Sequence, residues 1–600
     1  MQVTKTNLRN IAIIAHVDHG KTTLVDGLLR QSGVFRENQQ VLERVLDSND
    51  LERERGITIL AKNISVLVTD RHSGDQIKVN LVDTPGHADF GGEVERVLNM
   101  VDGVLLLVDA AEGPRPQTRF VHKAIVVINK IDRKDADPER VLNETFDLFI
   151  ELGATDEQAD FPVIYTVATA QQAGLTPQVE SDLQPLFDTI LAEIPAPVVD
   201  LDAPVKMLVT TLDYDSYRGQ TAIGRIFAGK MYIGQPVSRL QLNGGNLPET
   251  IRYLYVWEGL DRIEVEQAEA GDIVAVAGLE DVSIGETLSD PENPVALSTI
   301  TIEEPTVRMN FEVNTSPFNG REGQWGTSRK LRQRLFNELR SNLALRVEET
   351  DSSDRFIVSG RGELHLAILI ETIRREGFEF QVSRPEVILR CGADGKIQEP
   401  FEEVHIETSQ ETVGAVVEML GKRRGTMQDI QDSGSGSVQL TFIVPTRGML
   451  GFRYHLLTAT RGMATMNTIF QGYDTILGAI SSRSRGSLVA WEFGKTTTFG
   501  LKNAEERGTL FLKPGTEVYE GMVVGEHQRP GDLDVNVCKT KHLTNMRNSI
   551  RDIEIRLSPP RELSLDEAIE YLADDELLEI TPQNIRIRKR ILDLHHRGRQ

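Results

Sequence analysis

The sequence predicts a protein of several domains, in which an α/β domain comes first and β and α+β regions follow. The chain has 600 residues, and since a single hydrophobic core stops growing at about 250–300 residues, several cores are expected. Its composition, 40% hydrophobic and 26% charged, is typical of globular protein. Near residue 200 the short apolar runs stop alternating with helical stretches and become separated by glycine-rich turns, which marks a change of fold class.

Residues 1–200 are expected to form the α/β domain. Their apolar runs mostly lack polar alternation, which is typical of strands buried on both faces of a mostly parallel sheet. The expected strands are residues 11–14, 64–68, 79–82, 104–108, 125–128 and 163–165.

Four further domains follow in this prediction. The first has the glycine-rich turns of a β-barrel, the next two mix strand and helix signals, and the last is mostly β-like. That last domain ends in a short helix, for which Ser564 and Glu567 are spaced as a capping box. The expected ranges are 201–300, 301–390, 391–480 and 481–600.

Several classes of protein are disfavoured. No run of about 18 apolar residues occurs, so a membrane span is not expected, and the first residues lack the apolar core of a secretory signal. Cys391 and Cys538 are the only cysteines, which excludes a disulfide scaffold and a cysteine-only zinc site. We therefore expect a cytoplasmic protein that is monomeric and has no membrane partner.

The net charge of −24, taken alone, disfavours a nucleic-acid partner. Its distribution is uneven, because residues 481–600 hold 19 basic and 19 acidic side chains. The tail is therefore basic relative to the rest of the chain, and this asymmetry keeps a nucleic-acid contact there open.

A phosphate-binding loop is predicted at residues 15–22, Ala-His-Val-Asp-His-Gly-Lys-Thr, between an expected strand and an expected helix. Backbone N–H groups at a helix N-terminus can cradle phosphate oxygens, the lysine can neutralise the β- and γ-phosphates, and the threonine hydroxyl can bind Mg²⁺. A chance Gly-Lys-Thr in a turn is the alternative, which the flanking elements disfavour. The binding residues would be Asp18, His19, Gly20, Lys21, Thr22 and Thr23.

Two more motifs follow expected strands in the same order along the chain. In Asp83-Thr84-Pro85-Gly86-His87, the Asp83 carboxylate can hold the metal through water and the Gly86 N–H can meet the γ-phosphate, although Pro-Gly is also a common turn. In Asn129-Lys130-Ile131-Asp132, the Asp132 carboxylate can accept two hydrogen bonds from guanine that adenine cannot supply. Three such motifs at strand ends together predict a GTP site.

A switch loop is a further hypothesis. Residues 55–59, Arg-Gly-Ile-Thr-Ile, lie between the first two motifs, and the Thr58 hydroxyl could bind Mg²⁺ only while a γ-phosphate is present. A charged loop that runs into a strand is the simpler alternative, and it stays open at this point.

These four motifs together resemble those of the translational GTPases. Gly-Arg-Ile-Phe-Ala-Gly at 224–229 resembles the second domain of elongation factor G, the stretch 359–366 its third domain, and Glu-Pro-Phe-Glu at 399–402 the start of its fifth. No room remains for its large fourth domain. Four tail segments are similar to the C-terminal domain of the TypA/BipA family, at 488–492, 506–508, 518–526 and 543–547.

The resemblance implies a P-loop GTPase domain, a β-barrel, two ferredoxin-like α+β domains and a mostly β C-terminal domain that contacts RNA. It implies that His87 orients the attacking water when GTP is hydrolysed to GDP and phosphate, and that Val17 and Ile57 form an apolar gate that holds His87 back. It also implies that the Ala168 N–H meets guanine O6, although Val167 stands where the family has serine.

The partners that the resemblance implies are both subunits of the bacterial ribosome, its rRNA and A-site tRNA, in ribosome assembly and stress-adapted translation. The RNA-binding candidates are Lys539, Lys541, His542, Asn545 and Arg547. A second basic run could be a solvent-exposed surface or an RNA contact, and it comprises Arg586, Arg588, Lys589 and Arg590.

Two other functions are weighed against this one. Only 14 residues separate Asp109 from Ala124, and if residues 110–114 form a loop, about eight remain for a helix. The connection is thus at the limit for a parallel crossover, which usually needs about a dozen or more residues. The segment near Lys123 could therefore misplace Asn129 and Asp132, leaving a ribosome- or RNA-binding protein with an impaired nucleotide site. A translocase or back-translocase like elongation factor G or LepA is disfavoured by the missing fourth domain and by the tail.

Overall fold

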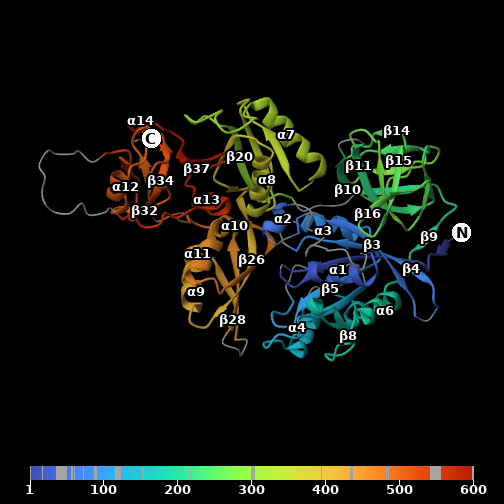
Figure 1. The fold of residues 1–600 in the computed structure, drawn as a ribbon. Helices are drawn as coiled ribbons and strands as arrows, with labels where there is room; N and C mark the ends of the chain where they lie inside the picture. The colour runs from blue at the N-terminus through green and yellow to red at the C-terminus, as the bar shows by residue number, and fades with distance from the viewer. Residues whose placement is uncertain are drawn as a thin grey trace, which may run out of the picture. The chain divides into compact units, whose positions relative to one another are not determined.

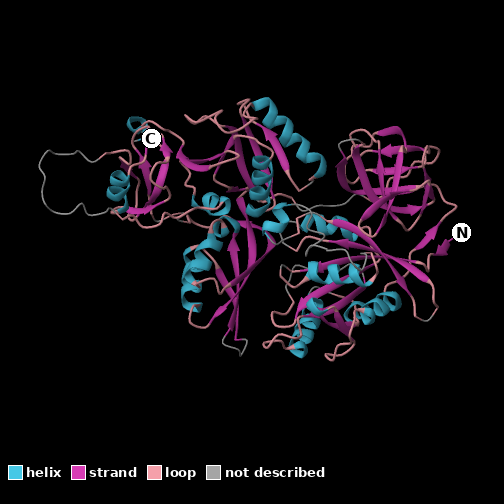
Figure 2. Ribbon diagram, in the orientation of Figure 1, coloured by secondary structure: helices cyan, strands magenta, loops and turns pink. Residues whose placement is uncertain are grey.

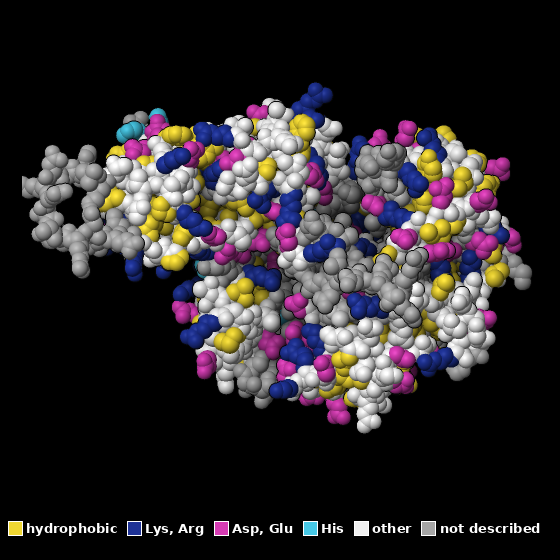
Figure 3. Space-filling model, in the orientation of Figure 1, with side chains coloured by type: hydrophobic (Ala, Val, Ile, Leu, Met, Phe, Trp, Pro, Cys, Tyr) yellow, Lys and Arg dark blue, Asp and Glu magenta, His cyan; other side chains and the backbone are white. Residues whose placement is uncertain are grey.

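The computed structural model forms two compact units, residues 1–303 with 340–343, and residues 304–339 with 344–600 (Figures 1 and 2). On the visible face, Lys and Arg side chains are interspersed with Asp and Glu (Figure 3). The structure describes residues 2–16, 18–34, 50–55, 58–59, 61–71, 73–86, 91–114, 123–151, 154–215, 218–298, 304–342, 344–392, 395–432, 437–480, 483, 485–540 and 556–597.

The first unit opens with a seven-stranded sheet in the order β3-β4-β2-β5-β6-β7-β8. All its pairs are parallel except the two edge pairs, β3 with β4 and β7 with β8. The expected strands and the mostly parallel sheet are confirmed. The bounds are β2 Leu8–Ala15, β3 Lys62–Thr69, β4 Gln76–Asp83, β5 Gly103–Asp109, β6 Lys123–Asn129, β7 Val163–Val167 and β8 Gln172–Gly174.

Helices cover both faces of this sheet, which explains why its central strands lack polar alternation. Leu24 of α1 and Phe187 of α6 pack in one core with Ile13, and Phe149 of α4 packs in another core with Ile14. The helices are α1 Lys21–Gln31, α2 Asp50–Arg55, α3 Gly91–Leu98, α4 Pro138–Glu151, α5 Asp156–Ala159 and α6 Gln184–Glu193.

An antiparallel, barrel-like sheet follows in the same unit, in the order β14-β13-β19-β10-β11-β18-β15-β16. Its apolar core includes Met207, Ile226 and Val274. The bounds are β10 Lys206–Asp215, β11 Gly219–Ala228, β13 Pro236–Leu240, β14 Asn246–Thr250, β15 Tyr253–Glu258, β16 Asp261–Glu264, β18 Ile273–Ala277 and β19 Thr287–Ser289. Two small pairs join β1 Gln2–Thr4 to β9 Val198–Asp200 and β12 Lys230–Tyr232 to β17 Gln267–Glu269.

The second unit begins with a seven-stranded sheet packed against α7 Ser328–Ser341 and α8 Glu363–Arg375. Two of its strands come from the far end of the chain, because β36 pairs antiparallel with β23 from Phe380↔Ile580 to Ser383↔Leu577. The bounds are β20 Val307–Val313, β21 Arg346–Glu349, β22 Arg355–Gly360, β23 Phe380–Ser383, β24 Glu386–Val387, β36 Glu576–Ile580 and β37 Ile585–Lys589.

An α+β region with a five-stranded sheet comes next, and Val404, Leu420 and Phe442 lie in its core. Its strands are β25 Arg390–Cys391, β26 Ile397–Ser409, β27 Thr426–Asp432, β28 Ser437–Pro445 and β29 Thr465–Thr475, and its helices are α9 Val413–Lys422, α10 Thr446–Met449 and α11 Phe452–Ala459.

The tail is mostly β, as expected. The Ser564–Glu567 capping box at the start of α13 is confirmed. The elements are β30 Ser487–Ala490, β31 Gly494–Lys495, α12 Thr498–Glu505, β32 Gly508–Leu510, β33 Glu517–Val518, β34 Val523–His527, β35 Leu533–Val535, α13 Leu565–Tyr571 and α14 Leu594–Arg597. Within the described ranges, no helix is both long and apolar enough to span a membrane. The boundaries of the five expected domains stay a prediction.

Candidate nucleotide site

The loop between β2 and α1 turns sharply at Gly20. Gly20 has a φ of 95° and caps the N-terminus of α1, and a Cβ on it would lie 2.4 Å from the Asn129 amide nitrogen. Only glycine meets both demands without strain. The first N–H groups of α1 therefore face the loop, where the helix dipole favours an anion such as phosphate.

A buried ion pair joins the first two motifs. The Lys21 Nζ lies 3.1 Å from Asp83 Oδ1 and donates to the Thr84 carbonyl, while the Thr84 hydroxyl donates to the Ile13 carbonyl at 2.8 Å. Burial raises the pKa of Asp83 despite the neighbouring ammonium. The ends of β2 and β4 are thus tied together, with one lysine and one carboxylate beside the phosphate-binding loop.

The expected metal ligands fit Mg²⁺ by their chemistry, because hydroxyl and carboxylate oxygens are the donors that this hard cation prefers. Asp83 is 1% exposed and Thr58 is 5% exposed, so both are largely shielded from bulk water. Thr22 is half-buried in the first turn of α1, next to the exposed Thr23, and Gly86 is half-buried after the end of β4.

Asn129, at the end of β6, links the phosphate loop to the end of β7. Its amide nitrogen donates to the His19 carbonyl at 2.9 Å. Its amide oxygen accepts from the Thr166 hydroxyl at 3.0 Å and from the Ala168 N–H at 3.1 Å. The side chain is buried, so all three bonds are shielded from competing water, and Asn129 fixes two loops with one amide.

Lys130 makes a second link. It adopts a φ of 61°, and its Nζ donates to the Asp18 carbonyl at 2.6 Å and lies 2.7 Å from Asp109 Oδ2. Asp132 follows as an exposed side chain. Sequence reasoning missed Asp109 and Thr166 as partners, although both occupy polar positions at or near the ends of buried strands.

The short crossover does not displace Asn129. β6 pairs in parallel register with β5 from Gly103↔Lys123 to Asp109↔Asn129, and Asn129 reaches both loops. Residues 115–122 lie outside the described part. The alternative in which the short crossover misplaces Asn129 is therefore not favoured, because seven residues of ladder and buried apolar packing hold the strand register. The position of Asn129 and Asp132 relative to a guanine base stays a prediction.

Several expected site residues lie outside the described ranges: Val17, Ile57, His87, Lys541, His542, Asn545 and Arg547. Of the RNA-binding candidates, Lys539 is described and exposed, and its carbonyl accepts from the Thr497 hydroxyl at 2.5 Å. The switch role of Thr58 stays a prediction. Its neighbour Ile59 is anchored, since the Ile59 N–H donates to the buried Glu52 carboxylate at 2.9 Å.

The second basic run is neither a solvent-exposed surface nor an RNA contact over most of its length. Arg588 and Lys589 are 2% and 1% exposed. Arg588 donates to the Thr315 hydroxyl at 2.7 Å, and Lys589 lies 3.0 Å from the buried Glu576. Arg590 alone is exposed. The run is internal because β37 extends a sheet and its cations meet buried acceptors there.

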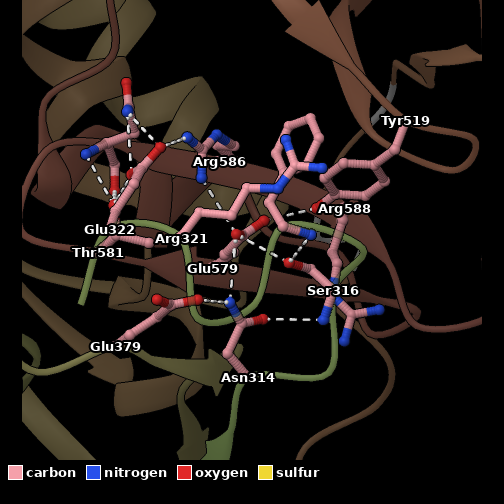
Figure 4. A network of polar contacts seen from close by, with 12 residues as sticks. Asn314, Ser316, Arg321, Glu322, Glu379, Tyr519, Glu579, Thr581, Arg586 and Arg588 are labelled. Carbon is pink, nitrogen blue, oxygen red and sulfur yellow. Dashed lines mark hydrogen bonds and ion pairs between the residues drawn. The ribbon is translucent and has the colours of Figure 1, made fainter. Parts of the chain in front are cut away.

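The same strands carry a buried carboxylate network (Figure 4). Glu579 is 0% exposed. One oxygen accepts from Asn314 at 3.2 Å, Ser316 at 2.9 Å and Arg586 at 3.1 Å, and the other accepts from the Tyr519 hydroxyl at 2.6 Å. The network therefore joins the β36–β37 hairpin and the tail to the loop after β20.

Replacing Tyr519 with phenylalanine should alter stability at alkaline pH. Burial and the Glu579 charge raise the pKa of Tyr519 well above 10, so the folded state keeps a proton that the unfolded state loses. This stabilisation is present below about pH 10 and is lost as pH rises above it. Urea unfolding at about pH 8 and about pH 11 should show a smaller alkaline loss for the variant than for the original chain. Equal losses would contradict the assignment.

The fold and this site define a GTP-binding protein of the translational GTPase class. Family models match its parts in order: the elongation factor Tu GTP binding domain at residues 6–196, elongation factor G domain 2 at 204–291, the elongation factor G C-terminus at 396–484, and the TypA/BipA C-terminal domain at 485–594.

Relatives match nearly the whole chain. The large ribosomal subunit assembly factor BipA of Bacillus subtilis is 50% identical over 99% of this chain and 97% of its own length. The protein of the same name from Synechocystis is 51% identical over 97% and 98%. The chain belongs to the TypA/BipA family of translational GTPases. A crystal structure of a Thermus thermophilus protein, at 18% identity, shares the fold with a TM-score of 0.53 over 78% of this chain and 97% of that one.

Proposed function

We propose that this protein hydrolyses GTP to GDP and phosphate on the bacterial ribosome and acts in assembly of the large subunit. The observation that carries the nucleotide part is the Asn129 link, because it holds the Lys21-bearing loop and the Ala168 loop around one edge of the sheet. The names of the relatives, large ribosomal subunit assembly factor, support the ribosomal part.

The residues would act as follows. Lys21 would turn from Asp83 and Thr84 to the β- and γ-phosphates, and Asp132 would accept two hydrogen bonds from guanine. The Ala168 N–H, which donates to Asn129, would share its hydrogen with guanine O6. Residues Thr22, Thr58 and Asp83 would hold Mg²⁺, which neutralises charge on the phosphates when bound.

The chemical step would be in-line attack of water on the γ-phosphate. A bond forms between the water oxygen and phosphorus, the bond to the β-phosphate oxygen breaks, and GDP leaves. His87 would orient the water, and Val17 and Ile57 would keep His87 away until the ribosome positions it. The gate role of Val17 and Ile57 is what the family resemblance implies.

The proposed partners are both ribosomal subunits, rRNA and A-site tRNA, with RNA contacts through residues 539–547. We propose further that the chain acts in the cytoplasm as a monomer, during ribosome assembly and under stress. Titration with a fluorescent guanine nucleotide tests the first step, and saturable, Mg²⁺-sensitive binding is expected. Its absence would instead support the RNA-binding protein with an impaired nucleotide site.

Replacing His87 with alanine is expected to abolish the ribosome-stimulated part of GTP turnover, since positioned proton-transfer groups contribute about 100- to 10,000-fold. Nucleotide affinity should stay unchanged, because His87 acts only on the water. The measurement is GTP turnover with and without ribosomes. The matched control is His596→Ala, whose side chain is 67% exposed near the C-terminus. Unchanged stimulation in the His87 variant would refute its role.

A further inference from the structure

Two large aromatic side chains are exposed just after β30. Trp491 is 55% exposed and Phe493 is 60% exposed, and one residue separates them. Large aromatic side chains dominate the energetics of interfaces, so two exposed ones side by side in sequence indicate a contact surface. We define the aromatic edge as Trp491, Phe493, Lys495 and Lys539.

The aromatic edge is held rigidly from behind. The Phe493 ring meets the ring of Phe318 edge-on at 6.0 Å between centroids, and Phe318, which is 3% exposed, meets Tyr519 at 4.9 Å. Tyr519 is in turn bonded to Glu579. The backbone N–H of Trp491 donates to the Val535 carbonyl at 3.1 Å. Because these positions are fixed, a partner that stacks here does not have to order a loose loop.

Cations lie close to these residues in the chain or contact the Phe318 ring behind them. The Lys495 side chain is 70% exposed, Lys539 is exposed, and the Arg321 guanidinium lies 4.4 Å from the centroid of the Phe318 ring. Glu517 is within ion-pair distance of both Arg321 at 3.3 Å and Lys495 at 3.6 Å. With the exposed Glu492 between the two aromatic residues included, three cations stand against two carboxylates, so the local charge is only slightly positive and is compatible with a negatively charged partner.

The position of the aromatic edge along the chain points to the same partner. The Thr497 N–H donates to the Val537 carbonyl at 3.0 Å, and the Thr497 hydroxyl donates to the Lys539 carbonyl. The backbone at residues 537–539, which leads into the RNA-binding candidate segment, is therefore hydrogen-bonded to Thr497, four residues after Phe493. The aromatic edge adjoins the start of that segment.

We propose that the aromatic edge is a stacking platform for unpaired RNA nucleotides, with Trp491 and Phe493 contacting base faces and Lys495 and Lys539 contacting phosphates. Every base offers a flat face, and stacking on aromatic side chains together with nearby cations is how proteins hold single-stranded RNA without reading its sequence. The proposal deepens the proposed function, on which it rests for the source of the RNA.

Charge alone should not explain the binding. Glu492 lies between the two aromatic residues, and Glu517 offsets part of the cationic charge. Stacking is therefore expected to supply most of the affinity, and the salt dependence should be shallow, since each phosphate contact adds only about one unit to the slope. Lys495→Ala should lower that slope by about one, with a small loss of affinity.

Tryptophan fluorescence tests the contact directly. Titrating the full-length chain with a short single-stranded RNA of mixed sequence should quench its emission, and Trp491→Phe should remove most of that quenching. The matched control is Trp325→Phe, because Trp325 is another exposed tryptophan of the same unit, at 41%. Equal quenching by a fully paired RNA duplex, or quenching that survives in Trp491→Phe, would overturn the stacking proposal.

Affinity gives the second measurement. Trp491→Ala should weaken binding of that RNA about tenfold or more, as loss of one stacked base does, whereas Trp491→Phe should recover part of it and Trp325→Phe should bind as the original chain does. If the Trp491 variant loses ribosome binding while the RNA alone neither binds nor quenches, the edge contacts a ribosomal protein and the proposal is wrong. If the original chain does not bind ribosomes at all, the proposed function fails instead.

Discussion

Replacing Asn129 with alanine is expected to weaken guanine-nucleotide binding roughly 30- to 1,000-fold. The change leaves the His19 carbonyl and the Ala168 N–H without the amide that pairs them, and each buried polar group left unpaired costs about 1–3 kcal/mol. In the free variant the two loops would relax toward water. Nucleotide binding would then have to reorder them, so the loss should appear in the dissociation constant.

Two further variants make this prediction specific. Thr166→Val removes one hydroxyl from the same amide oxygen and should cost about tenfold or less. Asn99→Ala is the matched control, because the side-chain amide of the exposed Asn99, just after α3, donates to the Glu95 carbonyl of that helix, and this variant should bind nucleotide normally. Equal affinities for Asn129→Ala and Asn99→Ala would show that the link does not organise the site.

The parallel sheet could be predicted from the sequence because strands that are buried on both faces appear there as continuous apolar runs. β5, Gly103–Asp109, is buried at every position, and residues 104–108 within it form an uninterrupted apolar run. The phosphate loop is equally local, since its glycine, lysine and threonine lie between one strand and one helix. Such features depend on residues that are neighbours in the sequence, so a local sequence pattern is enough to predict them.

The fate of the second basic run could not be predicted in the same way. Arg588 donates to Thr315 and Gln381, more than 200 residues away, and β36 pairs with β37 on one edge and with the distant β23 on the other. A run of arginines and lysines has the same pattern whether its acceptors are RNA phosphates or distant buried carboxylates. Only the tertiary fold decides between them.

The sequence also could not predict how the short crossover between β5 and β6 affects the position of β6. A count of residues between Asp109 and Ala124 suggests a displaced strand, but it does not include the packing that holds β6 in place. Ile125 and Val127 enter the core on one face of the sheet, and Val126 and Ile128 enter the core on the other. Burial of these four side chains holds β6 in place, since each contributes about 1.5–3 kcal/mol.

Replacing Glu579 with alanine is expected to loosen the β36–β37 hairpin. The change leaves Arg586, Tyr519, Asn314 and Ser316 without their shared carboxylate, and breaking a buried ion pair costs about 3–5 kcal/mol. A urea transition of a chain with several domains does not report on one hairpin alone, so amide hydrogen exchange is the better measurement of this local effect. Amides of residues 576–580 and 585–589 should exchange roughly 100- to 1,000-fold faster.

The matched control lies in the same sheet. Glu386 on β24 is 59% exposed and pairs with Arg308 at 3.3 Å, and exposed pairs contribute only about 0–1 kcal/mol. Glu386→Ala should therefore leave the protection of the hairpin unchanged, and Glu579→Gln, which keeps the acceptor oxygen but not the charge, should fall between the two. If Glu579→Ala speeds exchange in β30 and β34 as much as in the hairpin, the carboxylate stabilises the tail as a whole. If the hairpin amides alone respond, Glu579 is the specific link that keeps these two strands in a sheet whose other strands all end at or before Val387.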